Sequence, residues 1–99
     1  MSADRRLATF VADLQWRDVP VDVAQKVVQH VLDALGVMCA GLSDPSSAAV
    51  RSVASEAGSS LEASIVGSAM RGSAPLAAFV NAFHGRIHTF DDTYEAGPV

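Results

Sequence analysis

Apolar side chains recur with a helical period along the first half of the chain. A first helix is predicted over about 3–16, with Ser2 as its N-cap, because four apolar residues follow the i, i+3, i+4, i+7 spacing of one helix face: Leu7, Phe10, Val11 and Leu14. Pro20 interrupts this pattern, and Asp22 can cap a second helix that we expect to reach about Gly41. Its apolar positions keep the same period: Val23, Val27, Val28, Val31, Leu32 and Leu35.

The second half of this long helix has no polar face. Every residue from Ala34 to Leu42 is apolar or glycine, and a helix that is apolar on all sides is buried on all sides. Such burial requires more neighbouring elements than four helices of this length can readily supply. We therefore expect the segment to lie in the middle of something larger or in an interface.

A third helix and an extended segment follow. Asp44 and Pro45 are a typical cap and first-turn residue, and Gly58 is a typical stop, so a helix is predicted over about 45–57. Its inward face is expected to comprise four residues: Ala49, Val50, Val53 and Ala57. The partly β-branched run 63–67 favours a short extended segment.

Ser73 can cap a fourth helix that ends near His88. Its buried stripe is expected to comprise five residues: Leu76, Phe79, Val80, Phe83 and Ile87. The residues that follow are rich in aspartate, glycine and proline, and they predict a loop. The fold class is therefore all-α, a helical bundle fragment of about four helices and one short extended segment, within one domain.

Composition and charge exclude several classes of function. The chain has 99 residues, 49% of them apolar, and a formal net charge of −4. Lys26 is its only lysine, whereas nucleic-acid binding needs clustered cations. No apolar run approaches the about 20 residues of a membrane span, and no targeting signal is present. We expect a cytoplasmic protein that binds neither nucleic acid nor membrane.

Gly67 and Gly72 have the separation of the two glycines in a phosphate loop. In that motif a lysine follows the second glycine and reaches the terminal phosphates, but here Ser73 follows Gly72. A plain turn that leads into a helix is the stronger interpretation.

The end of the fourth helix and the following loop gather titratable side chains. His84 and His88 share one helix face, and three acidic residues follow them: Asp91, Asp92 and Glu95. A metal site could be drawn from these residues, but no HExxH pattern, EF-hand spacing or cysteine partner supports it. A proton-transfer or anion-binding site, which also uses Arg86 and Thr93, is the better hypothesis.

Two other reactive side chains are assigned structural roles. Cys39 lies in the all-apolar half of the second helix, where we expect it to behave as a small buried hydrophobe. His30 lies one turn from Lys26 and three residues from Asp33, which is ordinary company on a helix surface.

Three segments resemble the start of one enzyme family. They are LATFVADLQWRDVP, VVQHVLDALGVMCAGL and EASIVGSAMRGSAPLAAFVNAFHGRIHTFDDTYEAGPV. Together they resemble the N-terminal region of the 2-methylcitrate dehydratase (MmgE/PrpD) family, which also includes cis-aconitate decarboxylase. The most specific parts of the resemblance are the runs 32–36, 77–81 and 91–93.

The resemblance implies a lyase that acts on a small polycarboxylate. In this family an all-helical domain comes first, a smaller α/β lid domain follows, and no metal or organic cofactor is used. The implied reaction removes a proton or carboxylate next to a carbonyl-type group, with dehydration or decarboxylation as the result. By resemblance Asp91 and Asp92 are catalytic, and Thr93 donates a hydrogen bond to a substrate carboxylate.

The sequence departs from the family pattern around this loop. Ala82 stands where a glycine is usual, Thr89 where an acidic residue is common, and Arg86 and Tyr94 where histidines are common. Arg86, His88 and Tyr94 are therefore expected to bind substrate, with Arg86 or the flanking His84 and His88 adjusting the pocket. The substrate could differ from those of the named members.

The family pattern continues beyond this loop into catalytic lysines and the lid. Lys26 matches none of those lysines, so the resemblance implies that residues 1–99 are an N-terminal part of the helical domain and are inactive alone. The alternative hypothesis is a non-catalytic helical module that docks through the apolar faces of its second and fourth helices. A homodimer through the helices would cover those faces.

Overall fold

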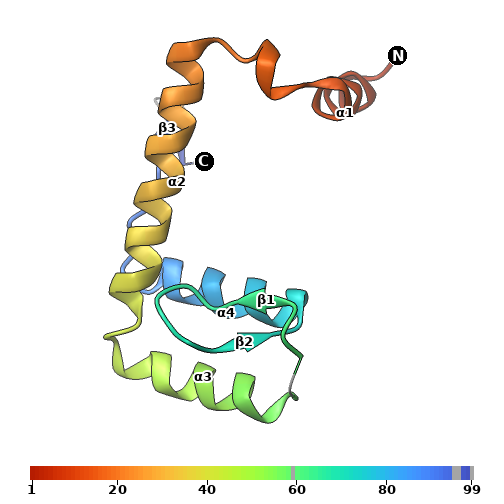
Figure 1. The fold of residues 1–99 in the computed structure, drawn as a ribbon. Helices are drawn as coiled ribbons and strands as arrows, with labels where there is room; N and C mark the ends of the chain where they lie inside the picture. Colours follow the sequence, from red (N-terminus) through yellow and green to blue (C-terminus); the bar gives the residue numbers. More distant parts are fainter. Residues whose placement is uncertain (59, 95–96, 99) are drawn as a thin grey trace.

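The computed structural model describes residues 1–58, 60–94 and 97–98. Over these residues it is mostly helical, as predicted, with four α-helices and two small antiparallel strand pairs. One end of the long helix α2 packs against α4 and lies near the turn of a hairpin, whereas α1 lies apart from them (Figure 1). The radius of gyration is 16.6 Å, compared with about 13 Å for a compact domain of this length. The fold is therefore elongated.

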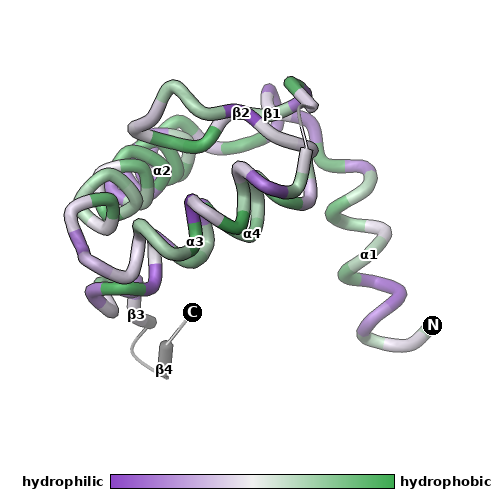
Figure 2. Tube along the Cα trace, turned by 90° about the horizontal axis from the view of Figure 1, so that it is seen from below, coloured by the Kyte–Doolittle hydropathy of each residue, from purple (hydrophilic) through white to green (hydrophobic). Residues whose placement is uncertain are grey.

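Helix α1 (Ala3–Asp13) begins as predicted and ends early. The Ser2 hydroxyl accepts a backbone hydrogen bond from the first turn, which confirms its capping role. The helix ends three residues before the predicted position because Leu14 adopts an extended conformation, and Trp16–Asp18 then forms a 3-10 turn. Leu7 and Phe10 of the apolar stripe are exposed, and Figure 2 shows α1 far from the other helices.

Helix α2 (Val21–Gly41) ends as predicted, but its N-cap differs. Pro20 occupies the N-cap position, and Asp22 lies in the first turn, where its charge suits the helix dipole. The predicted capping role of Asp22 is therefore wrong. Across the described residues, no helix is both long enough and apolar enough to cross a bilayer.

The C-terminal half of α2 is covered on one side. Helix α4 (Ala74–Arg86) packs there, and Val37 and Met38 are half-buried. Leu35 and Cys39 are exposed, so the expected burial of Cys39 is wrong. The reason is that, among the described residues, a helix packs against only one side of α2. The other apolar side stays exposed, as expected for a segment that needs further elements to cover it.

A glycine permits the close approach of α2 and α4. Gly41 is buried, and a Cβ atom added to it would lie 2.2 Å from the carbonyl oxygen of His84. No side chain fits at that distance, so the crossing of the two helices depends on this glycine.

Helix α3 (Pro45–Glu56) begins as predicted but buries a partly different face. The Asp44 side chain caps it, accepting a hydrogen bond of 2.9 Å from a first-turn N–H. Ser47 and Ala54 are its buried residues, whereas Val53 is 62% exposed. Of the predicted face, Val50 packs half-buried against the core, whereas Ala49, Val53 and Ala57 are exposed. The prediction is therefore only partly right, because α3 presents its small residues Ser47 and Ala54 to the core.

The segment predicted to be extended is half of a hairpin. Strand β1 (Ala63–Ser64) pairs antiparallel with β2 (Arg71–Gly72), a strand that the sequence did not predict. The backbone N–H of Ile65 donates to Met70 O at 3.0 Å, and Gly67 has φ +75° in the turn. The glycine pair with phosphate-loop spacing therefore belongs to a hairpin, and the turn continues directly into α4.

Asn81 of α4 fastens this hairpin to the helix. Its Oδ1 accepts a hydrogen bond of 2.9 Å from Val66 N–H, and its Nδ2 donates at 3.1 Å to Ser64 O. Both partners are backbone groups, so Asn81 satisfies one donor and one acceptor that the two-residue strands leave over. The run 77–81, among the most specific parts of the family resemblance, thus includes a residue with a structural role.

The core lies between α3, α4 and the hairpin. Its buried apolar residues are Ala54, Ile65, Ala77 and Val80. The stripe predicted for α4 is partly confirmed, because Val80 is buried and Leu76 packs half-buried against the core. Phe79 is exposed, since the fully buried face runs through Ala77, Val80 and His84. α4 ends two residues before the predicted position, and Ser73 lies at its N-cap without a side-chain bond; Glu62 accepts the hydrogen bond there.

Candidate functional site

The loop after α4 runs back along α2. Thr89 has φ +55°, and its N–H donates to Arg86 O at 3.1 Å, so the chain reverses as the helix ends. The loop then passes beside α2 and reaches β3 (Thr93–Tyr94), which pairs with β4 (Gly97–Pro98) where the sequence predicted only a loop (Figure 1). The predicted catalytic residues are thereby placed next to the middle of α2.

Asp92 is bound to a histidine of α2. The Nδ1 atom of His30 donates to Asp92 Oδ2 over 2.6 Å. The two side chains are 55% and 47% exposed, so the contact forms at the surface, where solvent or a ligand can reach it. The pair joins residues 62 positions apart in the chain and fastens the loop to the helix.

Asp91 points to a different partner. Its Oδ2 atom accepts a hydrogen bond from Arg86 Nη1 and forms an ion pair with it. The two adjacent aspartates therefore have separate partners: Asp92 bonds to His30, and Asp91 pairs with Arg86.

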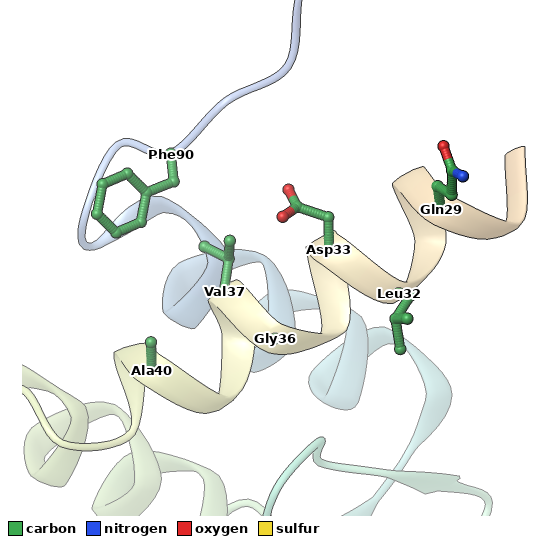
Figure 3. A pocket seen from close by; sticks show the side chains of 7 residues that line it. All are labelled: Gln29, Leu32, Asp33, Gly36, Val37, Ala40 and Phe90. Carbon is green, nitrogen blue, oxygen red and sulfur yellow. The ribbon is translucent and has the colours of Figure 1, made fainter. Parts of the chain in front are cut away.

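An acidic groove lies between the loop and α2. Its volume is 210 Å³, and it is lined by eight residues: Asp33, Ala34, Val37, Met38, Gly85, Phe90, Asp91 and Asp92. A second groove of 440 Å³ along α2 shares Asp33, Val37 and Phe90 with the first. Figure 3 shows Asp33 and Val37 pointing from the helix toward the side on which Phe90 lies. Three carboxylates thus face the space next to the predicted catalytic loop.

His88 lies at the other end of the loop. Its Nε2 atom is 3.4 Å from Ala40 O, and its ring lies 5.8 Å from that of Phe90. This places His88 near the C-terminal end of α2, whereas His30 and Asp92 meet farther toward the N-terminal end. The predicted substrate-binding role of His88 stays a prediction.

Thr93 is exposed and begins β3, opposite Pro98. Thr93 follows Asp92 directly in the chain, and its exposure leaves the hydroxyl open to a ligand. The backbone of Tyr94 belongs to β3, but its side chain lies outside what the structure describes, and so does Glu95. The roles predicted for Thr93, Arg86 and Tyr94 stay predictions.

His84 is not part of this group. It is fully buried between α4 and α3, and its ring forms a hydrogen bond of 2.9 Å with the Ser47 hydroxyl through Nε2. Burial lowers the pKa of His84, and the positive charge of Arg51 lowers it further. His84 is therefore a core residue, and the histidine pair read from helix spacing is divided between the core and the surface. Among the described residues, no group of three metal-ligating side chains comes together.

His30 is the residue that sequence reasoning missed. The spacing of His30 and Asp33 predicted only that they share a helix surface, and the structure turns that surface toward the Asp loop. No local pattern could signal a contact across 62 positions. The arrangement offers an imidazole held by a carboxylate beside an open groove, which can transfer a proton.

Comparison with known proteins confirms the predicted family. The family model of the MmgE/PrpD N-terminal domain matches residues 5–99. No curated protein and no solved structure gives a significant match to the chain. Since the family match covers nearly all of the sequence, the chain belongs to the MmgE/PrpD family, in the region of its N-terminal domain.

Proposed function

We propose that this chain supplies the proton-transfer part of a lyase site that acts on a small polycarboxylate without a cofactor. The observation that carries the proposal is the loop 91–93, held against α2 by the His30–Asp92 hydrogen bond of 2.6 Å. Family membership supports a lyase, and loops held on rigid helices are common positions for catalytic residues.

The roles follow from the contacts of the loop. Asp92 orients an imidazole, Asp91 holds Arg86 at the rim of the site, and the exposed Thr93 hydroxyl donates to a substrate carboxylate. His88 and Tyr94 complete the predicted substrate contacts. The reaction removes a proton next to a carboxyl group and continues to dehydration or decarboxylation.

The charge of the acidic groove sharpens this proposal. Asp33, Asp91 and Asp92 line it, and the nearby Arg86 is already paired with Asp91. A polycarboxylate is repelled by such a surface unless further cations neutralise its carboxylates. We therefore expect residues 1–99 alone to show no turnover.

The test follows the first chemical step directly. The full natural gene product that carries these residues is incubated in D₂O with a panel of di- and tricarboxylic acids, and NMR measures deuterium uptake next to each carboxyl group. We expect exchange with at least one acid and about a 100-fold loss in Asp92→Asn, since proton transfer by a positioned group contributes at least that much.

Asp18→Asn is the matched control for this experiment. Asp18 lies in the 3-10 turn, remote from the acidic groove, so the same charge change should leave the exchange rate unaltered. If no acid exchanges, or if Asp92→Asn exchanges as fast as the parent protein, the proposed function is wrong.

A second candidate function, a helical docking module, is favoured by the exposed apolar surface. The chain exposes 7379 Å², compared with about 5,400 Å² for a compact protein of this mass. The excess of about 2,000 Å² is as large as a stable dimer interface. The sequence hypothesis places the contact on the second and fourth helices. We propose instead a homodimer through α2 and α1, because Phe10, Val28 and Leu32 are all exposed on them.

Light scattering after gel filtration tests this candidate. We expect the mass of two chains for the parent protein and of one chain for Leu32→Glu, because a buried, unpaired carboxylate opposes association. Val53→Glu is the control, since Val53 is exposed on α3 and lies outside the apolar surface of α1 and α2. A monomeric parent protein would exclude the dimer.

A further inference from the structure

We propose that His30 is a catalytic acid–base residue and that Asp92 is its positioning residue. This inference rests on the proposed function and adds to it the group that moves the proton. It follows from the orientation of the imidazole, from its exposure beside the acidic groove, and from its place on a long helix.

The partner of His30 fixes its tautomer. A carboxylate oxygen only accepts hydrogen bonds, so the 2.6 Å contact with Asp92 Oδ2 requires the proton to be on Nδ1. In the neutral ring the lone pair is then on Nε2. Within the part of the chain that the structure describes, no side chain or backbone group bonds to that Nε2 atom.

The imidazole is accessible and rigidly mounted. His30 is 55% exposed, and Asp33, one turn farther along α2, lines the acidic groove together with Asp92. α2 spans Val21–Gly41 without interruption, so the helix determines the position of the ring more precisely than a loop could. Asp92 both lines the groove and bonds to the ring, so a substrate bound over the groove would lie near the imidazole, and Thr93 follows Asp92 in the chain.

The chemistry balances with these two groups. Nε2 takes a proton from the carbon next to a substrate carboxyl group; the C–H bond breaks, an N–H bond forms, and the electron pair moves into the carboxyl group as an enolate. The imidazolium that results is stabilised by the Asp92 carboxylate. In a dehydration the pair returns to form a C=C bond as the C–O bond of the neighbouring hydroxyl breaks, and the departing oxygen takes the proton from Nε2 as water.

The orientation of the ring is tested without any substrate. ¹⁵N NMR of the imidazole in the full natural gene product should show the proton of neutral His30 on Nδ1. In Asp92→Asn it should move to Nε2, the form that free histidine favours. Asp91→Asn is the matched control and should leave the tautomer unchanged, because Asp91 pairs with Arg86. A proton on Nε2 in the parent protein would overturn the inference.

The catalytic role is tested by the same deuterium exchange. We expect His30→Ala to lose about 100-fold in exchange rate and to recover part of it when imidazole is added, which a merely structural residue would not do. Lys26→Ala, one turn away on the exposed surface of α2, should exchange like the parent. Exchange that survives His30→Ala overturns this inference alone, whereas a parent protein that exchanges no acid overturns the proposed function.

Discussion

The two ends of α2 carry apolar residues with the same helical period, but they differ in what covers them. Near Gly41, α4 crosses at backbone contact, and the core of α3, α4 and the hairpin begins. Toward Val21, α1 lies apart and the large side chains of both helices are exposed. The core end combines the small residues Ala54 and Ala77 with Ile65 and Val80, whereas the exposed end is rich in Val and Leu.

This difference teaches what hydrophobic period can and cannot predict. The period shows which face of a helix is apolar, but the approach of two helices depends on where small residues permit backbone contact. The exposed end of α2 has an apolar face against which no described element packs. His30 lies on the same helix between the two regions. The predictions below test how different these two ends are.

The largest difference is expected between Ile65→Ala and Leu32→Ala. Ile65 is 1% exposed in the core and Leu32 is 69% exposed on α2. Removing the Ile65 side chain should lower the free energy of unfolding by about 3 kcal/mol, because burial is lost and a cavity remains. Leu32→Ala should change it by less than about 0.5 kcal/mol. Urea titration followed by circular dichroism measures both values.

Leu32→Ala also tests whether another chain covers the exposed end of α2. If its loss approached that of Ile65→Ala, the exposed end would be buried in an assembly, and the contrast between the two ends of α2 would hold only for the isolated chain. Repeating the titration at several protein concentrations separates these cases, since the stability of a dimer depends on concentration.

Two glycines of α2 provide the second test. A Cβ on Gly41 would lie 2.2 Å from His84 O, whereas nothing lies within 4 Å of a Cβ on Gly36. Gly41→Ala should destabilise the protein by about 2 kcal/mol, because α2 and α4 must separate. Gly36→Ala should stabilise it by up to about 1 kcal/mol, through helix propensity. Thermal melts should therefore move in opposite directions, and equal melts would mean that the crossing is not tight.

Much of the fold could be predicted because its signals are local. Caps and stops at Ser2, Asp44 and Gly58, together with helical period, place the four helices within a few residues. β2 was missed because two-residue strands have no period to detect, and the pairing depends on Asn81, which is distant in sequence. The buried faces of α3 and α4 were only partly predicted: Val80 is in the core and Val50 and Leu76 pack against it. Val53 and Phe79 are exposed, because the period of apolar residues ignores side-chain size.

The candidate site was only partly predictable for a related reason. The motif 91–93 is contiguous and could be recognised from the family resemblance, but its partner His30 is 62 positions away from Asp92. His84 was grouped with His88 because both lie on one helical face. The structure separates them, since α4 ends at Arg86 and the chain turns before His88 reaches the core side.

The third test concerns the titration of the core. His84 is buried and its pKa lies below the usual 6.5, chiefly because burial disfavours the charged ring. The unfolded chain therefore binds the proton more tightly, so stability is fully present above pH 6.5 and declines as the pH falls below it. The slope is at most about 1.4 kcal/mol per pH unit for one proton. Urea titrations between pH 7 and pH 5 measure it.

Two variants test whether His84 causes this decline of stability with falling pH. His84→Gln retains a hydrogen-bonding group for Ser47 and removes the titrating ring, so the decline should become shallower. His30→Gln removes an exposed ring outside the core and should leave the decline from His84 in place. A decline that is unchanged in His84→Gln would mean that another group controls the acid sensitivity of the core.

The smallest effect is expected from the helix caps, and it distinguishes the two regions once more. Ser2 and Asp44 each accept a backbone hydrogen bond from the first turn of a helix, but α3 packs against α4, whereas α1 lies apart. Asp44→Ala should lower Tm by a few degrees, and Asp44→Asn should restore it, because the amide oxygen can still accept. Ser2→Ala should fray α1 and leave the melt of the core unchanged. A core melt that falls with Ser2→Ala would mean that α1 is covered, and the separation of the two regions would then be wrong.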